Sequence, residues 1–256
     1  MEQRILPFLQ HMNDLLDGHL LSVHLYGSCV MDDFQPGWSD IDVLCFTDCP
    51  IPTEKAEQLM MLRQTLVEET GDPIFRSIEG ALVCAHEFEK DQFTSVIYWG
   101  TGGQRITSHY SLDGFSCHSI INFGRCIWGK DLSSIIPIVS FRDLLFEIRR
   151  LLTTIRIHAQ KTNESLYSCG WMLDIARCLY TLRHKTIISK TEAGKWALQQ
   201  HLCPEPHQME QTLIVRQNPS ETLKTPEIRV WLKTLGPSIQ KFADVLENEL
   251  KEHEND

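Results

Sequence analysis

The chain has 256 residues, of which 42% are apolar and 23% are charged, and its formal net charge is −10. This composition is typical of a globular protein with a substantial core, and the negative charge argues against a protein that binds nucleic acid through Lys and Arg. It is compatible with a small cationic substrate that is attracted to an acidic cleft. Since there is no run of about 18 apolar residues and no sign of a signal peptide, we expect a cytoplasmic protein that does not bind membranes.

The first part of the chain alternates helical and strand patterns. The spacing of apolar residues predicts helices at 2–18 and 53–70 and strands at 21–26, 40–46 and 74–84, with a turn-rich connection at 31–39. Thr53 is expected to cap the second helix and Gly71 to end it. The nine cysteines are scattered without a CxxC pair, so we expect neither a disulfide framework nor a zinc site.

The second part of the chain is expected to be helical. Residues 98–118 read as a loop with short strands, and 119–128 as a strand or a short helix. Helical patterns follow at 140–160, at 166–183, from the capping residue Ser189 through Leu202 and at 237–252, before a charged tail that is expected to fray. We therefore predict an α/β domain at 1–136, with a mixed sheet flanked by helices, and an all-α helical bundle at 137–256.

The stretch HLYGSCVMDDFQPGWSDIDV, residues 24–43, holds the most informative pattern. Side chains alternate between faces along a strand, so Asp40 and Asp42 point the same way, about 7 Å apart. A bound divalent cation would offset their repulsion, and Mg²⁺ prefers carboxylate oxygens together with substrate phosphates. Gly27 ahead of them allows the backbone to approach a phosphate, and Ser28 adds a hydroxyl donor.

This order of strand, Gly-Ser pair and Asp-apolar-Asp resembles the nucleotidyltransferase superfamily that includes DNA polymerase β. The superfamily pattern includes a third acid on a neighbouring strand, and Glu79 in RSIEGALV fits it. We expect Glu79 in the middle of its strand, where an acid is costly without a partner. Asp72, Glu68 and Glu69 are alternatives, but they fall at a helix end or turn, where acids are usually solvated.

A narrower family is similar over most of the chain. LYGSCVMDDFQPGWSDIDVL resembles the first motif of the aminoglycoside adenylyltransferases that act on the 3″ position of streptomycin or the 9 position of spectinomycin. RSIEGALV resembles the strand that carries their catalytic glutamate. LDIARCLYTL and ISKTEAGKWAL resemble the arginine-bearing helix and the lysine-bearing segment of their helical domain. Similarity is weak only around residues 86–135.

The resemblance implies roles for the residues of the α/β domain. Asp40 and Asp42 hold Mg²⁺, which bridges the phosphates of ATP. Ser28 and the backbone at Gly27 steady the triphosphate. Glu79 is the general base that takes a proton from the acceptor hydroxyl. Mg²⁺ is thus the implied cofactor and ATP the co-substrate.

The resemblance also implies that Arg177 and Lys190 reach from the helical domain to the triphosphate. Arg177 has apolar neighbours in its helix, so it is expected to pair with a carboxylate, a phosphate or a helix end, and an internal salt bridge is the alternative. Lys190 stands just inside a helix start, where a solvated surface residue is equally compatible with the sequence.

The acceptor side departs from the family pattern. Tyr167 in SLYSCGW stands where the family has an aspartate that grips the cationic drug, and YWGTGGQR, with Trp99, replaces a Gly-Glu-Trp loop. Tyr167 and Trp171 share the start of the arginine helix and are candidates for the acceptor pocket. His109 and His118 are interpreted as surface or acceptor-pocket residues, because no further metal ligands are evident near them.

We therefore expect an enzyme that moves AMP from Mg-ATP to a hydroxyl of a small cationic acceptor, with an aminoglycoside antibiotic, and hence antibiotic resistance, as the leading interpretation. One alternative keeps the chemistry and changes the acceptor to another antibiotic, a metabolite or a protein. The other is a nucleotide-binding regulator without catalysis, and nucleic-acid synthesis is disfavoured by the charge. We expect a monomer whose partners are ATP and the acceptor.

Overall fold

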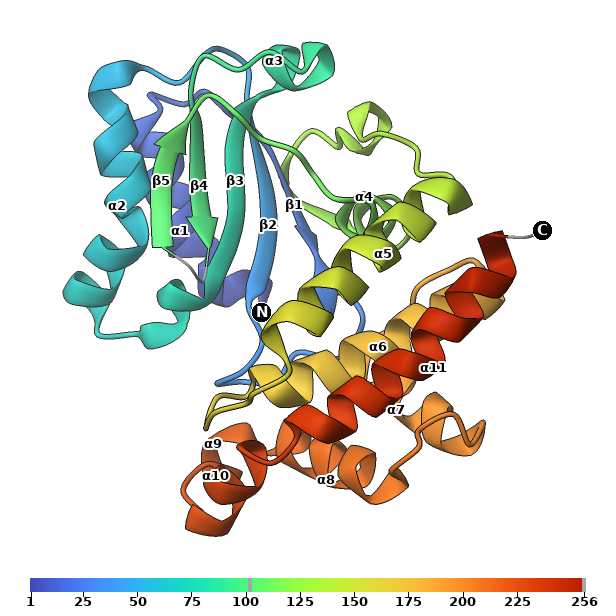
Figure 1. Cartoon of the computed structure of the whole chain (residues 1–256). Coiled ribbons are helices and arrows are strands. Elements are labelled where there is room, and N and C mark those ends of the chain that lie inside the picture. Colours follow the sequence, from blue (N-terminus) through green and yellow to red (C-terminus); the bar gives the residue numbers. More distant parts are fainter. Residues whose placement is uncertain (101–102, 255–256) are drawn as a thin grey trace. The chain divides into compact units, whose positions relative to one another are not determined.

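The computed structural model describes residues 1–100 and 103–254 (Figure 1). Residues 101–102 of the loop expected at 98–118, and the last two residues of the tail expected to fray, lie outside the described residues. The chain divides into two compact units, Met1–Met31 with Asp40–Ile138 and Asp32–Ser39 with Val139–Asp256. The domain limits expected at 136 and 137 stay a prediction.

The α/β unit is built on a six-stranded sheet with the order β5-β4-β3-β2-β1-β6. Strands β2 and β3 are parallel because helix α2 connects them, whereas the other neighbouring strands are antiparallel. Its strands are β1 Leu20–Tyr26, β2 Ile41–Thr47, β3 Ile78–Cys84, β4 Val96–Gly100, β5 Gly103–Thr107 and β6 Arg125–Gly129. Its helices are α1 Glu2–Leu15, α2 Thr53–Thr70, α3 Ala85–Lys90 and α4 Gly114–Phe123.

The three central strands, β1, β2 and β3, are covered on both faces. Each of them is buried along its length except at its second residue, which is Leu21, Asp42 or Glu79. Helices α1 and α2 lie side by side, α2 contacts β4 and β5, and α4 contacts β1 (Figure 1). Two of the three second residues are therefore carboxylates at the one half-buried position of an otherwise apolar strand.

The second unit is helical outside segment 32–39. Its central helix is α6, which contacts α5, α7, α8 and α11 and buries most of its residues. The unit contains α5 Phe141–His158, α6 Tyr167–His184, α7 Lys190–Gln199, α8 Pro206–Gln217, α9 Pro219–Thr222, α10 Pro226–Leu232 and α11 Gly236–Glu254. The predicted fold class, a mixed α/β unit followed by a helical region, is confirmed.

Several local expectations were wrong. Residues 73–77 form a 3₁₀ turn, so β3 begins at Ile78 and Glu79 lies at its start instead of in its middle. Thr53 is the first residue of α2 and Pro52 is the residue before it, without a side-chain cap. The segment 119–128 is shared between the end of α4 and β6. Helix α7 ends at Gln199, three residues earlier than expected.

Two of the expected helix ends are confirmed. The side chain of Ser189 accepts a hydrogen bond from the N–H of Glu192 and so caps α7. Gly71 ends α2 in the left-handed conformation, with φ +72. None of the described helices is both long and apolar enough to cross a membrane.

Gly80, in β3, provides a test of strand packing. Its φ is +142, and an added Cβ would lie 1.8 Å from the carbonyl oxygen of Val43 on β2. We expect Gly80→Ala to lower the free energy of unfolding by about 3 kcal/mol or more, because the strands must separate or the backbone must change. Gly170→Ala in α6, where no atom lies within 4 Å of the added Cβ, should be neutral or stabilising by up to about 1 kcal/mol. Urea unfolding would measure the free energy of unfolding of both variants. Equal changes in Gly80→Ala and Gly170→Ala would contradict the proposed clash between β3 and β2.

Candidate active site

Strands β1, β2 and β3 bring the predicted carboxylates Asp42 and Glu79 to neighbouring positions of the sheet. Asp42 on β2 is the register partner of Glu79 on β3, and Tyr26 on β1 is the antiparallel partner of Asp42. Side chains at paired positions of neighbouring strands share a face. Asp40 directly precedes β2 and lies two residues before Asp42, so the strand that was expected to begin at residue 40 begins one residue later, at Ile41. All three carboxylates are half-buried.

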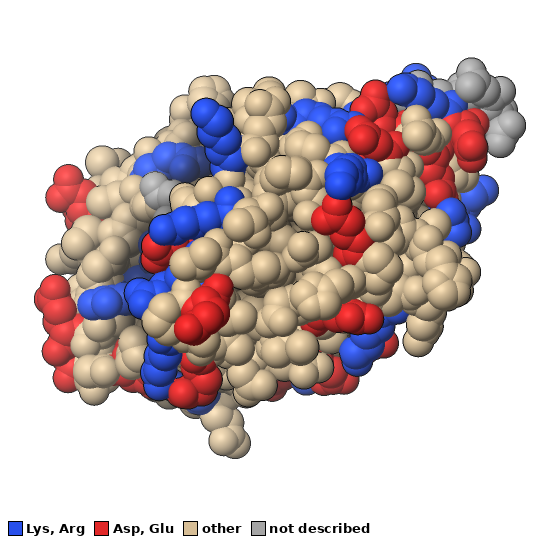
Figure 2. Space-filling model, turned by 60° about the horizontal axis from the view of Figure 1, so that its bottom comes forward, with Lys and Arg blue, Asp and Glu red and all other residues tan. Residues whose placement is uncertain are grey.

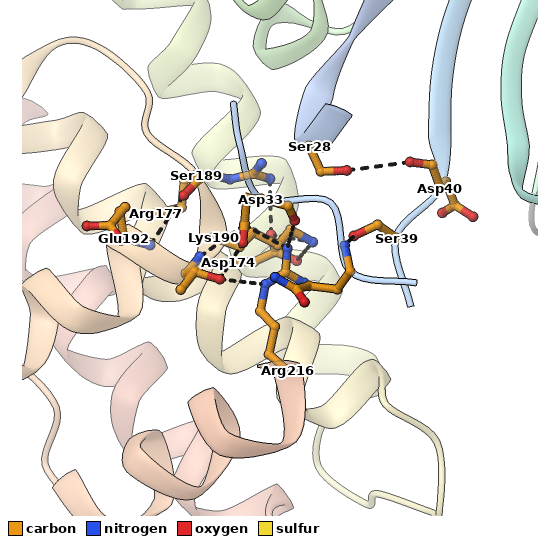
Figure 3. A network of polar contacts seen from close by, with 12 residues as sticks. Ser28, Asp33, Ser39, Asp40, Asp174, Arg177, Ser189, Lys190, Glu192 and Arg216 are labelled. Atoms are coloured by element: carbon orange, nitrogen blue, oxygen red, sulfur yellow. Dashed lines mark hydrogen bonds and ion pairs between the residues drawn. The ribbon is translucent and has the colours of Figure 1, made fainter. Parts of the chain in front are cut away.

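The Gly-Ser turn after β1 lies against these aspartates. Gly27 has φ +64, and a Cβ at this position would lie 2.0 Å from Oδ2 of Asp42, so only glycine fits there. The N–H of Gly27 donates to Oγ of Ser119 on α4 at 3.1 Å. Oγ of Ser28 donates to the carbonyl oxygen of Asp40 at 3.5 Å (Figure 3). The turn and the start of β2 are thus held together within the α/β unit.

Burial raises the pKa values of two groups next to these acids, and the negative charge of the acids raises them further. Burial raises the pKa of Tyr26 well above its ordinary value, and Asp42 and Glu79 raise it further. Burial, followed by the charge of Asp42, raises the pKa of Cys29 to about 12. Asp40 and Asp42 offer hard carboxylate oxygens, which are the ligands that Mg²⁺ prefers. The residues present therefore fit a divalent cation.

Two residues that the sequence analysis did not identify accompany Glu79. Tyr98 on β4 forms a side-chain hydrogen bond with Glu79, and burial followed by the charge of Glu79 raises the pKa of Tyr98. Arg63 on α2 is buried and donates to the carbonyl oxygen of Ile78 at 2.6 Å. Burial lowers the pKa of Arg63, while Glu79 and Asp40 oppose that shift. Arg63 is thus a buried cation close to two of the carboxylates.

The alternative acids have other surroundings. Asp72 caps the 3₁₀ turn by accepting from the N–H of Ile74 at 3.0 Å, and it pairs with Arg4 at 3.0 Å. Glu68 and Glu69 are exposed at the end of α2. These positions are explained by capping and solvation.

The residues considered in the Gly-rich region also have structural explanations. Trp99 is fully buried, packs edge-on against Phe8 and donates Nε1–H to the carbonyl oxygen of Met60 at 3.1 Å, so it is a core residue. His109 is exposed. His118 is half-buried, and burial lowers its pKa.

The helical unit carries the two predicted cations on neighbouring helices. Nη2 of Arg177 on α6 donates to Asp174 Oδ1 at 3.0 Å, and Nζ of Lys190 at the start of α7 lies 3.1 Å from the same oxygen (Figure 3). Burial opposes the charge of Asp174, but Lys190 and Arg177 hold its pKa below its usual range. The sequence alone missed Asp174, although its spacing of three residues from Arg177 on one helix was a usable indication.

The start of α6 also carries the two aromatic candidates. Tyr167 is 61% exposed, and its ring stacks on that of Trp171, with centroids 6.3 Å apart and planes at 28°. This pair gives the unit an exposed aromatic surface. On the face drawn in Figure 2, acidic and basic side chains are interspersed.

Two family models match the chain. A model described as the nucleotidyltransferase domain matches residues 4–93, and one described as the C-terminal domain of aminoglycoside adenylyltransferase matches residues 139–220. No match was found among curated proteins. A crystal structure of spectinomycin adenyltransferase from Enterococcus faecialis, with ATP and spectinomycin, matches with a TM-score of 0.67 and 15% identity, over 96% of this chain and 99% of that chain.

The two family matches occupy the two halves of the chain in the order that the resemblance predicted. The solved structure shows the same fold over nearly the whole of both chains. The chain therefore belongs to an aminoglycoside adenylyltransferase-like family of nucleotidyltransferases.

Proposed function

We propose that this protein transfers AMP from Mg-ATP to a hydroxyl group of a small cationic acceptor of the aminoglycoside type, at a 3″ or 9 position. The observation that carries the proposal is the pairing of Asp42 with Glu79 across β2 and β3, next to the Gly-Ser turn. The structural neighbour, which was solved with ATP and spectinomycin, supports the choice of co-substrate and acceptor class.

The α/β unit supplies the residues for metal and phosphate. We assign Asp40 and Asp42 to Mg²⁺, and Ser28 together with the backbone around Gly27 to the triphosphate. When bound, Mg²⁺ would stabilise negative charge on the phosphates during transfer. The burial of the flanking strands limits the positions that the two carboxylates can take, so they are arranged before the ligand binds.

Glu79 is the residue that we assign to proton transfer. It accepts the proton of the acceptor hydroxyl while that oxygen bonds to the α-phosphorus of ATP and the bond from this phosphorus to pyrophosphate breaks. An alcohol is a weak nucleophile at neutral pH, so a positioned carboxylate assists the attack. The hydrogen bond with Tyr98 orients Glu79 for this role.

Arg177 and Lys190 are assigned to the triphosphate. Both are only partly exposed, at 23% and 30% of the side chain, and Asp174 holds both cations in place. Fixed cations stabilise the charge that develops on leaving pyrophosphate without reorganisation during the reaction.

A second candidate keeps this chemistry and changes the acceptor. It is favoured by Tyr167, which is exposed and stacked on Trp171 where the family pattern has an acid. An aromatic surface binds a sugar ring or a cation by stacking, whereas a carboxylate selects for positive charge. Another antibiotic or metabolite therefore fits this surface as well.

Pyrophosphate release from Mg-ATP with a panel of acceptors tests the proposal directly. We expect release with at least one aminoglycoside or aminocyclitol in the wild type, and a loss of about 100-fold or more in Asp42→Asn, because a metal ligand is lost. Asp91→Asn is the matched control, since Asp91 is exposed after the end of α3 and Asn tolerates its left-handed backbone conformation.

The outcomes separate the candidates. Nucleotide binding without transfer to any drug would reject the aminoglycoside acceptor and keep the second candidate. Unchanged Mg²⁺-dependent binding in Asp42→Asn would reject the metal assignment. Label from ATP on a protein would identify a protein acceptor.

Gly27→Ala tests the contact between the turn and Asp42. The added Cβ would displace the Asp42 carboxylate, so we expect kcat/KM to fall by about 100-fold. Gly18→Ala is the control, because Gly18 has φ +89 but no atom within 4 Å of an added Cβ, so it introduces backbone strain alone. Comparable losses of activity in both variants, measured at equal fractions of folded protein, would show that strain and not displacement is responsible.

Glu79→Gln tests the assignment of the general base. We expect kcat to fall by about 10²- to 10⁴-fold, because the amide cannot take up the proton. The Kd for ATP, measured by calorimetry, should change much less. A parallel loss of ATP affinity and kcat would instead place Glu79 among the nucleotide or metal ligands.

A further inference from the structure

The segment 32–39 has an unusual place in the chain. It belongs to the helical unit, although the residues on both sides of it belong to the α/β unit. The segment is held in a turn in which the N–H groups of Trp38 and Ser39 donate to the carbonyl oxygen of Gln35, at 3.0 and 2.8 Å. Its last residue, Ser39, is followed directly by Asp40, the first of the two aspartates assigned to the metal.

A buried ion pair anchors the segment. Asp33 and Arg216 of α8 are 3% and 2% exposed, and Nη2 of Arg216 lies 2.7 Å from Oδ2 of Asp33. The same Nη2 donates to the carbonyl oxygen of Asp33 at 3.2 Å, and Nε donates to Oγ1 of Thr191 at 3.0 Å. The guanidinium also lies over the ring of Trp38, 5.1 Å from its centroid.

A buried pair of this kind is a weak source of net stability. Desolvation of the two charges offsets most of their attraction, and apolar residues of the same volume often serve stability equally well. The pair does, however, define one arrangement, because each donor must meet its acceptor. Burial opposes the charge of Asp33, but Arg216 and Thr191 hold its pKa below its usual value, so the pair remains ionised at neutral pH.

The same cluster reaches the start of α7. Oδ2 of Asp33 accepts from the N–H of Thr191 at 3.2 Å, and the hydroxyl of Thr191 donates to Oδ1. Asp33 therefore caps the helix that begins with Lys190, in addition to the cap from Ser189. The residue that precedes Thr191 contacts Asp174, as Figure 3 shows.

We propose that Asp33, Thr191 and Arg216 form a latch that positions the metal-binding aspartates by tying segment 32–39 to the N-terminus of α7. These three residues are positioning residues, since they act through Asp40 and Asp42. The inference rests on the proposed function, because it takes those two aspartates as metal ligands. It goes beyond that function by giving three residues outside the metal site an effect on how tightly Asp40 and Asp42 bind the metal.

Arg216→Met tests the latch, with Arg156→Met as the matched control. Arg156 pairs with Asp244 and Glu247 of α11 at 2.7 and 2.6 Å, so its loss also removes an ion pair from the helical unit but leaves segment 32–39 untouched. The first measurement is the Kd of Mg²⁺ in the presence of a non-hydrolysable ATP analogue, at a temperature where both variants are folded. We expect the Kd of Mg²⁺ to rise by about 10- to 100-fold in Arg216→Met, which is the usual effect of losing a residue that orients a metal ligand. We expect the Kd of Mg²⁺ to be unchanged in Arg156→Met.

The second measurement needs no ligand. Amide hydrogen exchange across residues 31–42 should become faster in Arg216→Met and stay unchanged in Arg156→Met. If Arg216→Met does not fold, the same two measurements are made on Thr191→Val, with the same expected results. This nearly isosteric change removes the contacts of the Thr191 hydroxyl with Asp33 and Arg216 without leaving a charge unpaired.

The results distinguish the two proposals. A wild type that binds no Mg-nucleotide would overturn the proposed function. A wild type that binds it, with equal Mg²⁺ affinity and equal exchange in the latch variant, would overturn the latch alone. An equal loss in Arg156→Met would also overturn the latch, because it would show that general destabilisation of the helical unit is sufficient.

Discussion

The candidate site depends on the parallel pairing of β2 with β3. This pairing places Asp42 beside Glu79, one on each of two strands that are otherwise apolar and buried. Neighbouring carboxylates repel each other, and the buried guanidinium of Arg63 and the hydroxyl of Tyr98 are two groups that offset part of this cost. The pairing also requires Gly80, since any side chain there would meet the backbone of β2.

Two half-buried or buried carboxylates of the helical unit, Asp174 and Asp33, contact the first two residues of α7. Lys190, the first residue of α7, contacts Asp174, and Thr191, the second, contacts Asp33. Helix N-termini favour anions, and Asp33 accepts from the N–H of Thr191, so Asp33 is stabilised by the backbone of α7 as well as by Arg216. An ammonium group has three donors, so the contact of Lys190 with Asp174 is compatible with a phosphate as a further acceptor. Under the proposed function, the start of α7 would serve both the structure of the helical unit and nucleotide binding.

The two sides of the proposed reaction differ in how closely they follow the family pattern. On the proposed metal and phosphate side, the carboxylates, the glycine and the cations follow the motifs of the family that the sequence resembles. At the acceptor side, Tyr167 and Trp171 offer stacked rings where an acid is expected. Because specificity is a difference in affinities among acceptors, a change of this kind would, under the proposed function, alter the choice of acceptor and leave the transfer step as it is.

The sequence by itself determined the fold class, the order of the main elements and the Gly-Ser and Asp-Ile-Asp motifs, because these features depend on the spacing of residues close together in the chain. It also indicated Glu79, through the cost of an acid in an apolar strand, although it misplaced the start of that strand. The tertiary structure decided which groups surround these motifs. Asp33 meets Arg216 across 183 positions of the chain, and Gly27 meets Ser119 across 92, so no local pattern could have paired them. Such contacts form only when strands and helices pack, since packing, and not sequence spacing, brings a buried charge to its partner.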